Sequence, residues 1–207
     1  MAAETINSAS DAAGLAAMIS RAAEQSGAAS RGLPPVTKWN PPFCGDLDME
    51  IRADGTWFYM GTPIGRAPLV RLFSTVLRKD EDGRTYLVTP VEKVGIRVVD
   101  APFVAVEMQV AERDGASLVT FRTNVGDVVE VDADHPLRFE TVGEERQLKP
   151  YVLVRGRLEA LVSRAVMYDL VALGETVEID GVEMFSVRSG AEIFPVMPAA
   201  ELERLAS

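Results

Sequence analysis

The chain has 207 residues, of which 47% are hydrophobic and 25% are charged. This is the composition of a globular protein and excludes fibrous and disordered classes. Its 31 acidic and 21 basic side chains give a net charge of −10, which disfavours nucleic acid and anionic membranes because both are negatively charged. With one histidine and one cysteine, the chain cannot form an internal disulfide or most metal sites. We therefore expect no metal and no cofactor.

Features of signal and membrane segments are missing from the sequence. No stretch approaches the roughly 20 apolar residues that cross a bilayer, and residues 1–27 lack the basic start and apolar run of a secretion signal. Cys44 has no partner in the chain, which fits a reducing compartment. We expect a cytoplasmic protein that does not insert into a membrane.

Residues 1–33 are predicted to form an amphipathic helix and a linker. Ser8 and Asp11 have the spacing of a capping box, and Leu15 and Ile19 follow at helical spacing. The apolar stripe is thin and rich in alanine. We therefore expect this helix to dock weakly on the body of the protein or on a second subunit.

The next segment, residues 34–42, contains four prolines in nine residues. Proline fixes φ and lacks a donor, so this composition favours an extended conformation. We expect the segment to lay Trp39 and Phe43 over the core. The alternative is a docking strap for a proline-binding module.

From Gly45 onward the pattern is mainly that of strands. Residues 46–52 and 56–60 flank a turn and predict a hairpin. Pro68 is placed in the first turn of a helix. The remaining predictions are strands at 86–88, 94–99, 103–111 and 117–123, and a helix over Arg157–Leu173 that Gly174 ends.

Comparison of the chain with itself indicates an internal duplication. Three short matches occur in one order, and each contains turn or helix-start residues. They predict a duplicated hairpin–helix–hairpin unit. The matched segments are 50–54 with 130–134, 67–70 with 159–162, and 82–87 with 180–185.

The duplication predicts an α+β fold of two related, β-rich units. The expected divisions are the helix and linker at 1–33, a first α+β unit at 34–100 and a second at 101–207. Residues 1–100 hold 11 basic and 12 acidic side chains, which leaves 10 basic and 19 acidic side chains for 101–207. Nearly all the negative charge therefore belongs to the second half.

Basic and aromatic residues form the candidate ligand site. Arginine suits carboxylate or phosphate groups, and Arg66 and Arg157 are expected at two helix N-termini, where the dipole favours anions. The alternative is that these arginines pair with the many acidic side chains. Tyr168 belongs to the same pattern. The predicted ligand-binding residues are Trp39, Trp57, Tyr59, Arg66, Arg122, Asn124, His135, Arg138, Arg155 and Arg157.

Evidence for catalysis is weaker. The sequence has no phosphate loop, dinucleotide fingerprint, nucleophile elbow or paired-histidine zinc motif. The only catalytic candidate is His135 with Asp134 or a neighbouring carboxylate, and Cys44 could act as a nucleophile only with that base. A structural role in the turn is the favoured interpretation of His135.

A set of short motifs also runs from about residue 35 to residue 195. They are Pro35-x-x-x-Trp39-Asn40-Pro41-Pro42, Gly45-Asp46-x-Asp48, Asp54-Gly55-x-Trp57, Gly61-Thr62-Pro63-Ile64, Tyr86-Leu87-Val88-Thr89-Pro90-Val91-Glu92-Lys93, Phe121-x-Thr123-Asn124, Asp134-His135-Pro136 and Tyr151-Val152-x-Val154-Arg155. As a set they resemble an uncharacterised bacterial family, domain of unknown function 1285. The resemblance implies two related α+β units, the second like a pleckstrin-homology barrel, with a ligand cleft between them and a suggested role in signalling. It implies no catalytic residues.

We therefore expect a non-enzymatic ligand-binding or regulatory module that binds a small anionic ligand between its two units. A protein-interaction adaptor is the first alternative, with a protein partner or a second copy of the chain in a homodimer. An enzyme that uses His135 is the second. Nucleic acid is disfavoured by the charge but is left open.

Overall fold

The structure is a computed structural model that describes residue 9 and residues 11–25, 32–144 and 146–206. The chain divides into two compact units. Unit 1 comprises Met1–Pro102 with Gly156–Leu158, and unit 2 comprises Phe103–Arg155 with Glu159–Ser207. Within the described residues, no helix is both long enough and apolar enough to span a bilayer.

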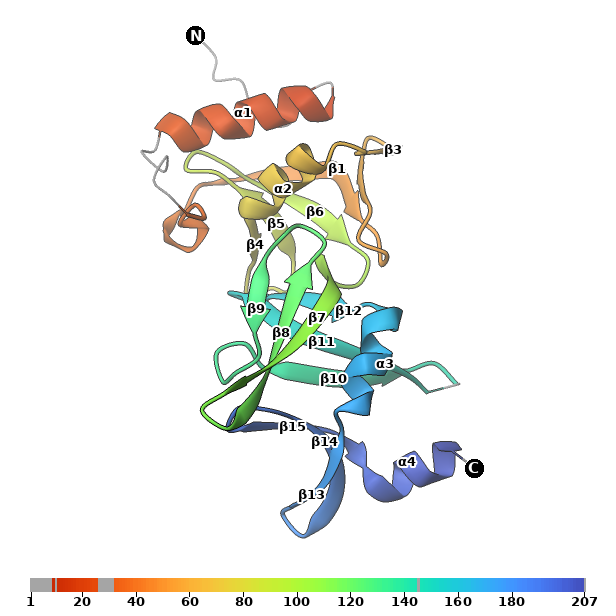
Figure 1. Ribbon diagram of the computed structural model, residues 1–207. Coiled ribbons are helices and arrows are strands. Elements are labelled where there is room, and N and C mark those ends of the chain that lie inside the picture. The colour runs from red at the N-terminus through yellow and green to blue at the C-terminus, as the bar shows by residue number, and fades with distance from the viewer. Residues whose placement is uncertain (1–8, 10, 26–31, 145, 207) are drawn as a thin grey trace. The chain divides into compact units, whose positions relative to one another are not determined.

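Unit 1 is built on a six-stranded sheet with the strand order β3-β2-β1-β6-β5-β4. The strands form two antiparallel meanders, β1-β2-β3 and β4-β5-β6, and the parallel pair β1–β6 joins them at the centre. Helix α2 lies between the two meanders in the sequence (Figure 1). The elements are α1 (Ala12–Gln25), η2 (Val36–Lys38), β1 (Phe43–Ile51), β2 (Trp57–Tyr59), β3 (Thr62–Pro63), α2 (Ala67–Thr75), β4 (Leu77–Lys79), β5 (Thr85–Val88) and β6 (Lys93–Val98).

The N-terminal helix α1 is part of the core of unit 1. It packs against α2, and Leu15 and Ile19 are fully buried. Asp11 caps the helix, because its side chain accepts a hydrogen bond from the backbone N–H of Gly14 at 2.7 Å. The predicted helix is therefore present and its apolar stripe is closely packed. The predicted cap Ser8 lies outside the described residues.

The proline-rich segment lies along unit 1 and contains the short 3-10 turn η2. Arg78 fastens it, since one guanidinium nitrogen donates to the carbonyls of Val36 at 2.8 Å and Trp39 at 2.7 Å. Asp80 in turn accepts from Arg78 at 2.6 Å. Phe43 meets the Tyr86 ring edge to face at 6.0 Å. The segment therefore lies against unit 1, but Phe43 is 50% exposed and Trp39 is half-buried, so the two aromatic side chains cover the core only in part.

Unit 2 repeats the strand order of unit 1 in its own six-stranded sheet, β10-β11-β12-β7-β8-β9. The meander β7-β8-β9 corresponds to β1-β2-β3, β10-β11-β12 corresponds to β4-β5-β6, and the central pair β7–β12 is again parallel. A separate antiparallel sheet, β13-β14-β15, follows. The elements are β7 (Phe103–Arg113), β8 (Ala116–Thr123), β9 (Val128–Glu130), β10 (Leu137–Val142), β11 (Gln147–Arg155), β12 (Leu158–Val162), α3 (Arg164–Ala172), β13 (Glu175–Ile179), β14 (Val182–Ser189), β15 (Glu192–Pro198) and α4 (Ala199–Ala206).

The two similar sheets establish an α+β architecture with two related units, but the sequence matches do not fall at equivalent places. The match of 67–70 with 159–162 is wrong, because the first segment is the start of α2 and the second belongs to strand β12. Residues 50–54 run from the end of β1 into a turn, whereas 130–134 run from the end of β9, which corresponds to β3 rather than to β1. The repeat is therefore one of strand order, and α2 has no counterpart between β9 and β10.

The helix predicted over Arg157–Leu173 is only half as long as expected. Leu158, Ala160 and Val162 are buried while the residues between them are half-buried, and this period of two is typical of a strand. Ser163 then caps α3 by accepting a hydrogen bond from the N–H of Val166 at 3.5 Å. The helix therefore starts at Arg164 and leaves Arg157 in a turn.

Candidate functional site

Among the predicted ligand-binding residues of unit 1, Trp57 and Tyr59 are core residues. Trp57 is 1% exposed and stacks on Phe73 with 6.3 Å between the ring centroids. Tyr59 is 5% exposed, and its hydroxyl donates to the carbonyl of Ala9 at 2.7 Å. Their contacts assign both side chains to packing.

The other three predicted residues of unit 1 lie at the surface or in the proline-rich segment. Arg66 is the exposed residue before α2, as predicted. Arg157 donates to Glu81 at 2.8 Å, and both side chains are exposed. Trp39 is half-buried and contributes its carbonyl to Arg78.

Three predicted arginines of unit 2 are paired with carboxylates. Arg138 donates two parallel hydrogen bonds of 2.9 Å to Glu159 and lies over the Tyr151 ring. Its pKa is raised, chiefly by the hydrogen bonds to Glu159. Arg155 donates to Asp127 at 2.6 Å, and Arg122 is bonded to Glu107. All three arginines therefore pair with acidic side chains, which was the alternative to a ligand-binding role.

Asn124 and His135 hold turns of unit 2. The Asn124 side chain accepts from the N–H of Val104 at 3.0 Å. Asp132 accepts from the backbone N–H groups of Asp134 and His135, at 2.9 and 2.8 Å, and lies 3.2 Å from Nδ1 of His135. Burial alone would raise the pKa of Asp132, but these hydrogen bonds outweigh burial and lower it.

The position of His135 disfavours the enzyme interpretation. Its side chain is 37% exposed in the turn, and the carboxylate beside it is that of Asp132 rather than Asp134. His135 lines none of four pockets whose lining residues the structure describes. Its visible role is to complete the turn before β10.

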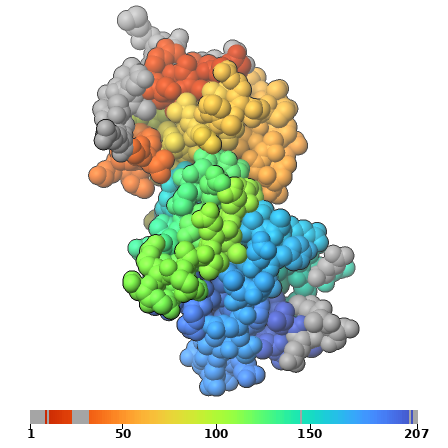
Figure 2. Space-filling model, in the orientation of Figure 1, coloured from red at the N-terminus to blue at the C-terminus, as the bar shows by residue number. Residues whose placement is uncertain are grey.

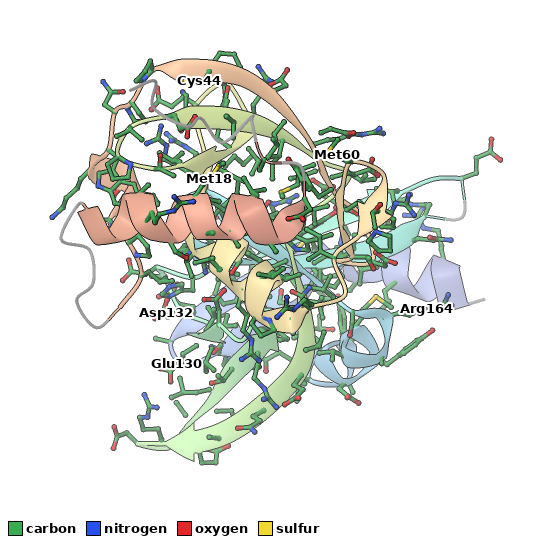
Figure 3. All side chains as sticks on the ribbon, turned by 90° about the horizontal axis from the view of Figure 1, so that it is seen from above. Met18, Cys44, Met60, Glu130, Asp132 and Arg164 are labelled. Atoms are coloured by element: carbon green, nitrogen blue, oxygen red, sulfur yellow. The ribbon has the colours of Figure 1, made fainter. Side chains whose placement is uncertain are left out.

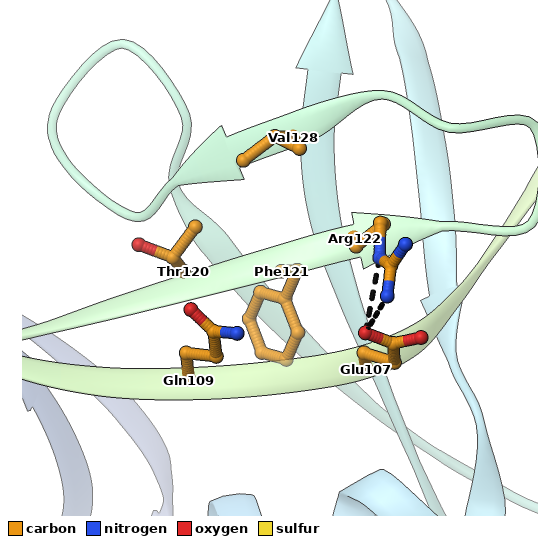
Figure 4. Close-up of a pocket in the computed structure, with 6 residues that line it drawn as sticks. All are labelled: Glu107, Gln109, Thr120, Phe121, Arg122 and Val128. Atoms are coloured by element: carbon orange, nitrogen blue, oxygen red, sulfur yellow. Dashed lines mark hydrogen bonds and ion pairs between the residues drawn. The ribbon is translucent and has the colours of Figure 1, made fainter.

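Arg122 is the only predicted arginine in one of these pockets, an open hollow of about 290 Å³ on the β7-β8-β9 face. Glu107 on β7 and Arg122 on β8 point toward each other at the hollow and are bonded (Figure 4). The other lining residues are Gln109, Thr120, Phe121 and Val128. Because the ion pair neutralises Arg122, this hollow offers little net attraction to an anion.

A second groove, formed where β11, β12 and α3 meet, has a different charge. The volume of this groove is about 380 Å³. Helix α3, which forms one side of it, lies on the surface of unit 2 that Figure 2 shows. We name this groove the α3 groove. Its lining residues are Gln147, Leu148, Lys149, Leu161, Val162, Arg164, Met167 and Tyr168.

The α3 groove contains two cations and no carboxylate among its lining residues. Each of the other three pockets has at least one carboxylate among its charged lining residues. These charged residues are Glu107 and Arg122 in the first pocket, Glu175 and Arg188 in the second, and Asp11 in the third. They are therefore neutral or negative. The α3 groove is the positive one of the four, although it lies in the acidic half of the chain.

Arg164 gives the groove its most available positive charge. The side chain is exposed at the first position of α3 (Figure 3). Its Nε donates to the hydroxyl of Tyr168 at 3.3 Å, and this bond raises the pKa of Arg164. Among the residues that the structure describes, the Arg164 guanidinium has no carboxylate partner.

Tyr168 was part of the predicted basic and aromatic pattern, but Arg164 and Lys149 were missed. An arginine was expected at the start of this helix, and the error lay in where the helix starts. The signal available in the sequence was the alternation of Leu158, Ala160 and Val162 followed by Ser163, a preferred capping residue. Lys149 carries no such signal, because β11 reaches the groove only through the tertiary fold.

Family comparisons cover most of the chain. Residues 34–101 match the N-terminal domain of DUF1285, described as a domain of unknown function. Residues 102–196 match the C-terminal domain of the same family. The chain belongs to the DUF1285 family. The resemblance expected from the motifs is thereby confirmed.

Two solved DUF1285 structures are similar to the chain. A protein from Silicibacter pomeroyi DSS-3 is 47% identical, with a TM-score of 0.82 over 95% of this chain and 100% of that one. A protein from Shewanella baltica OS155 is 29% identical, with a TM-score of 0.50 over 61% of this chain and 91% of that one. No curated protein matches the chain.

Proposed function

We propose that the protein is a non-enzymatic ligand-binding or regulatory module that binds a small anionic ligand in the α3 groove. The observation that carries the proposal is the exposed Arg164, which lines a positive groove without a carboxylate partner among the described residues. Four of the five arginines of the predicted site are instead paired with carboxylates, as Arg138 is with Glu159. A signalling role would follow if ligand binding altered a partner surface.

The polar groups of the groove are suited to holding an anion. A guanidinium presents a planar fork of donors that matches a carboxylate or a phosphate. The Tyr168 hydroxyl accepts from Arg164 and so keeps its own hydrogen to donate. Lys149 adds an ammonium group from the neighbouring strand β11. Arg164 and Tyr168 therefore supply two kinds of donor to one hollow, and Lys149 adds positive charge to it.

The size of the groove fits a small molecule. Its volume of about 380 Å³ falls at the lower end of the roughly 300–1,000 Å³ range of ligand pockets. Arg164 and Tyr168 lie one helical turn apart on α3, so both can face the same ligand group.

A thermal-shift screen with Arg164→Gln tests the proposal. Inorganic phosphate, nucleotides and organic carboxylates should be screened, because a ligand that binds the native state raises its melting temperature. We expect a stabilising anion to lose about tenfold or more in affinity in R164Q, since a charge-assisted hydrogen bond contributes about 1.5–3 kcal/mol.

Arg71→Gln is the matched control, because Arg71 is an exposed arginine on a helix of unit 1 and lies outside the groove. Binding should be unchanged in R71Q. An equal loss of affinity in R164Q and R71Q would show that binding depends only on the net charge of the protein. Equal affinity of the wild type and R164Q would contradict the proposed site.

We also propose that the two units share a common origin and that unit 2 is pleckstrin-homology-like. The same strand order in the two sheets supports the first statement. The antiparallel meanders and the third sheet with α4 support the second, and the parallel pair β7–β12 is where unit 2 departs from an antiparallel barrel. No ligand is inferred from this likeness, because a fold does not determine function.

A further inference from the structure

We infer that the ligand of the α3 groove is an amphipathic organic anion, with one anionic head group and an apolar body. This inference rests on the proposed function and adds the chemical class of the ligand. Straight-chain carboxylates of medium length are the simplest members of the class.

The apolar part of the groove supports an apolar body. Leu148, Leu161 and Met167 are half-buried and line the groove together with the buried Val162. They come from β11, β12 and α3, so aliphatic side chains of three elements meet there. A hydrated inorganic ion would leave this surface in water, whereas an apolar body would bury it.

Met167 makes the apolar part adaptable. It is unbranched and polarisable, and methionine fits ligands of irregular shape. Met167 follows Arg164 by three residues on α3, so the two side chains share one face of the helix. Tyr168, a residue that is 59% exposed, is bonded to Arg164 through its hydroxyl. The apolar and the polar parts of the groove therefore adjoin along α3.

The charges limit the head group. Two cations line the groove, and Glu140 lies opposite Lys149 on β10, where it accepts from Arg138. The second half of the chain has 19 acidic and 10 basic side chains, and this excess repels a polyanion such as a nucleoside triphosphate. A single carboxylate satisfies the donors with less repulsion.

The test is a titration of the full chain with acetate, butyrate, hexanoate and octanoate, followed by NMR of methionine methyl groups. The peak that disappears in Met167→Gln identifies Met167. Met60, an exposed methionine of unit 1, reports non-specific apolar association. Inorganic phosphate and ATP are titrated in parallel.

We expect the Met167 methyl peak to shift and the Met60 peak to stay in place. Affinity should rise about two- to fourfold for each added methylene, because burial of a methylene contributes up to about 0.8 kcal/mol. In M167Q this increment should shrink while the affinity for acetate is retained. R164Q should weaken every chain length by a similar factor.

The outcomes separate the two proposals. Binding that depends on Arg164 but not on chain length, or that favours phosphate or ATP, overturns the amphipathic ligand and leaves the proposed function standing. Absence of any Arg164-dependent anion binding overturns both. Equal shifts of Met60 and Met167 also overturn the inference, because they indicate non-specific association. If M167Q fails to fold, the chain-length series in the wild type decides.

Discussion

Arg78 shows how one side chain can position a whole segment. Its side chain is 16% exposed, and its guanidinium donates to the carbonyls of Val36 and Trp39 and to the Asp80 carboxylate. Lys93 donates to the same carboxylate at 2.8 Å. The proline-rich segment cannot supply these bonds itself, because proline has no N–H group.

Arg78→Met should therefore destabilise the protein. The change leaves two carbonyls and part of Asp80 without their donor, which should cost about 1–3 kcal/mol in the free energy of unfolding. Urea denaturation measures this cost. Arg97→Met is the control, because Arg97 is 73% exposed and lies 3.7 Å from Glu50, so its loss should change stability by less than about 0.5 kcal/mol. A loss in R78M no larger than in R97M would refute this role.

At the scale of elements, α3 is defined at both ends by its neighbours. Ser163 caps its start, and strand β12 occupies the residues before it because it pairs in parallel with β7. At the other end Gly174 follows the helix, as predicted, and its N–H bonds the carbonyl of Val171 at 2.9 Å. The φ of Gly174 is not positive, so a left-handed backbone conformation at the end of the helix does not explain why this residue is glycine. A Cβ at Gly174 would overlap the Phe185 ring, so close packing of β14 explains the glycine.

Gly174→Ala should accordingly be destabilising. The new methyl group has to displace the half-buried Phe185 ring, which should lower the free energy of unfolding by about 1–3 kcal/mol. Gly65→Ala is the matched control, since its Cβ would meet no atom within 4 Å. Chemical denaturation of the two variants makes the comparison. If G174A is as stable as G65A, the close approach to Phe185 does not constrain this position.

At the scale of the whole molecule, both units rely on carboxylates that are hydrogen-bonded in the folded state. Burial alone would raise the pKa of Asp80 in unit 1, but hydrogen bonds from Arg78 and Lys93 outweigh burial and lower it from 3.8. The pKa of Asp132 in unit 2 is likewise lowered by hydrogen bonds. A carboxylate whose pKa is lower in the folded state than in the unfolded state stabilises the fold at any pH above its unfolded-state pKa. This stabilisation is lost as the pH falls through the folded-state pKa.

We therefore predict that the free energy of unfolding falls as the pH is lowered below about 4 to 5. Asp80→Asn should be less stable than the wild type at pH 7 and should lose less of its stability on acidification. Urea unfolding from pH 7 to pH 3 measures both effects. Asp169→Asn, at an exposed position on α3, serves as the control. A pH dependence of D80N as steep as that of the wild type would contradict the role of Asp80.

The sequence by itself determined the features that depend on neighbours along the chain. The turn at Asp54-Gly55 is held by the Asp54 side chain, which accepts from Thr56 at 2.9 Å, and Pro68 lies in the first turn of α2. Such signals are local, so the β1–β2 hairpin, α2 and the strands from β5 to β8 follow from them. The motifs also predicted the family.

Only the tertiary structure decided which strands pair and which charges remain without a carboxylate partner. The parallel pairs β1–β6 and β7–β12 join segments far apart in the sequence, and the second pair moves the helix start from Arg157 to Arg164. Arg138 and Glu159 are likewise 21 residues apart. Ion pairs act through space at a few ångströms, so sequence spacing cannot distinguish the paired Arg138 from Arg164 in the α3 groove.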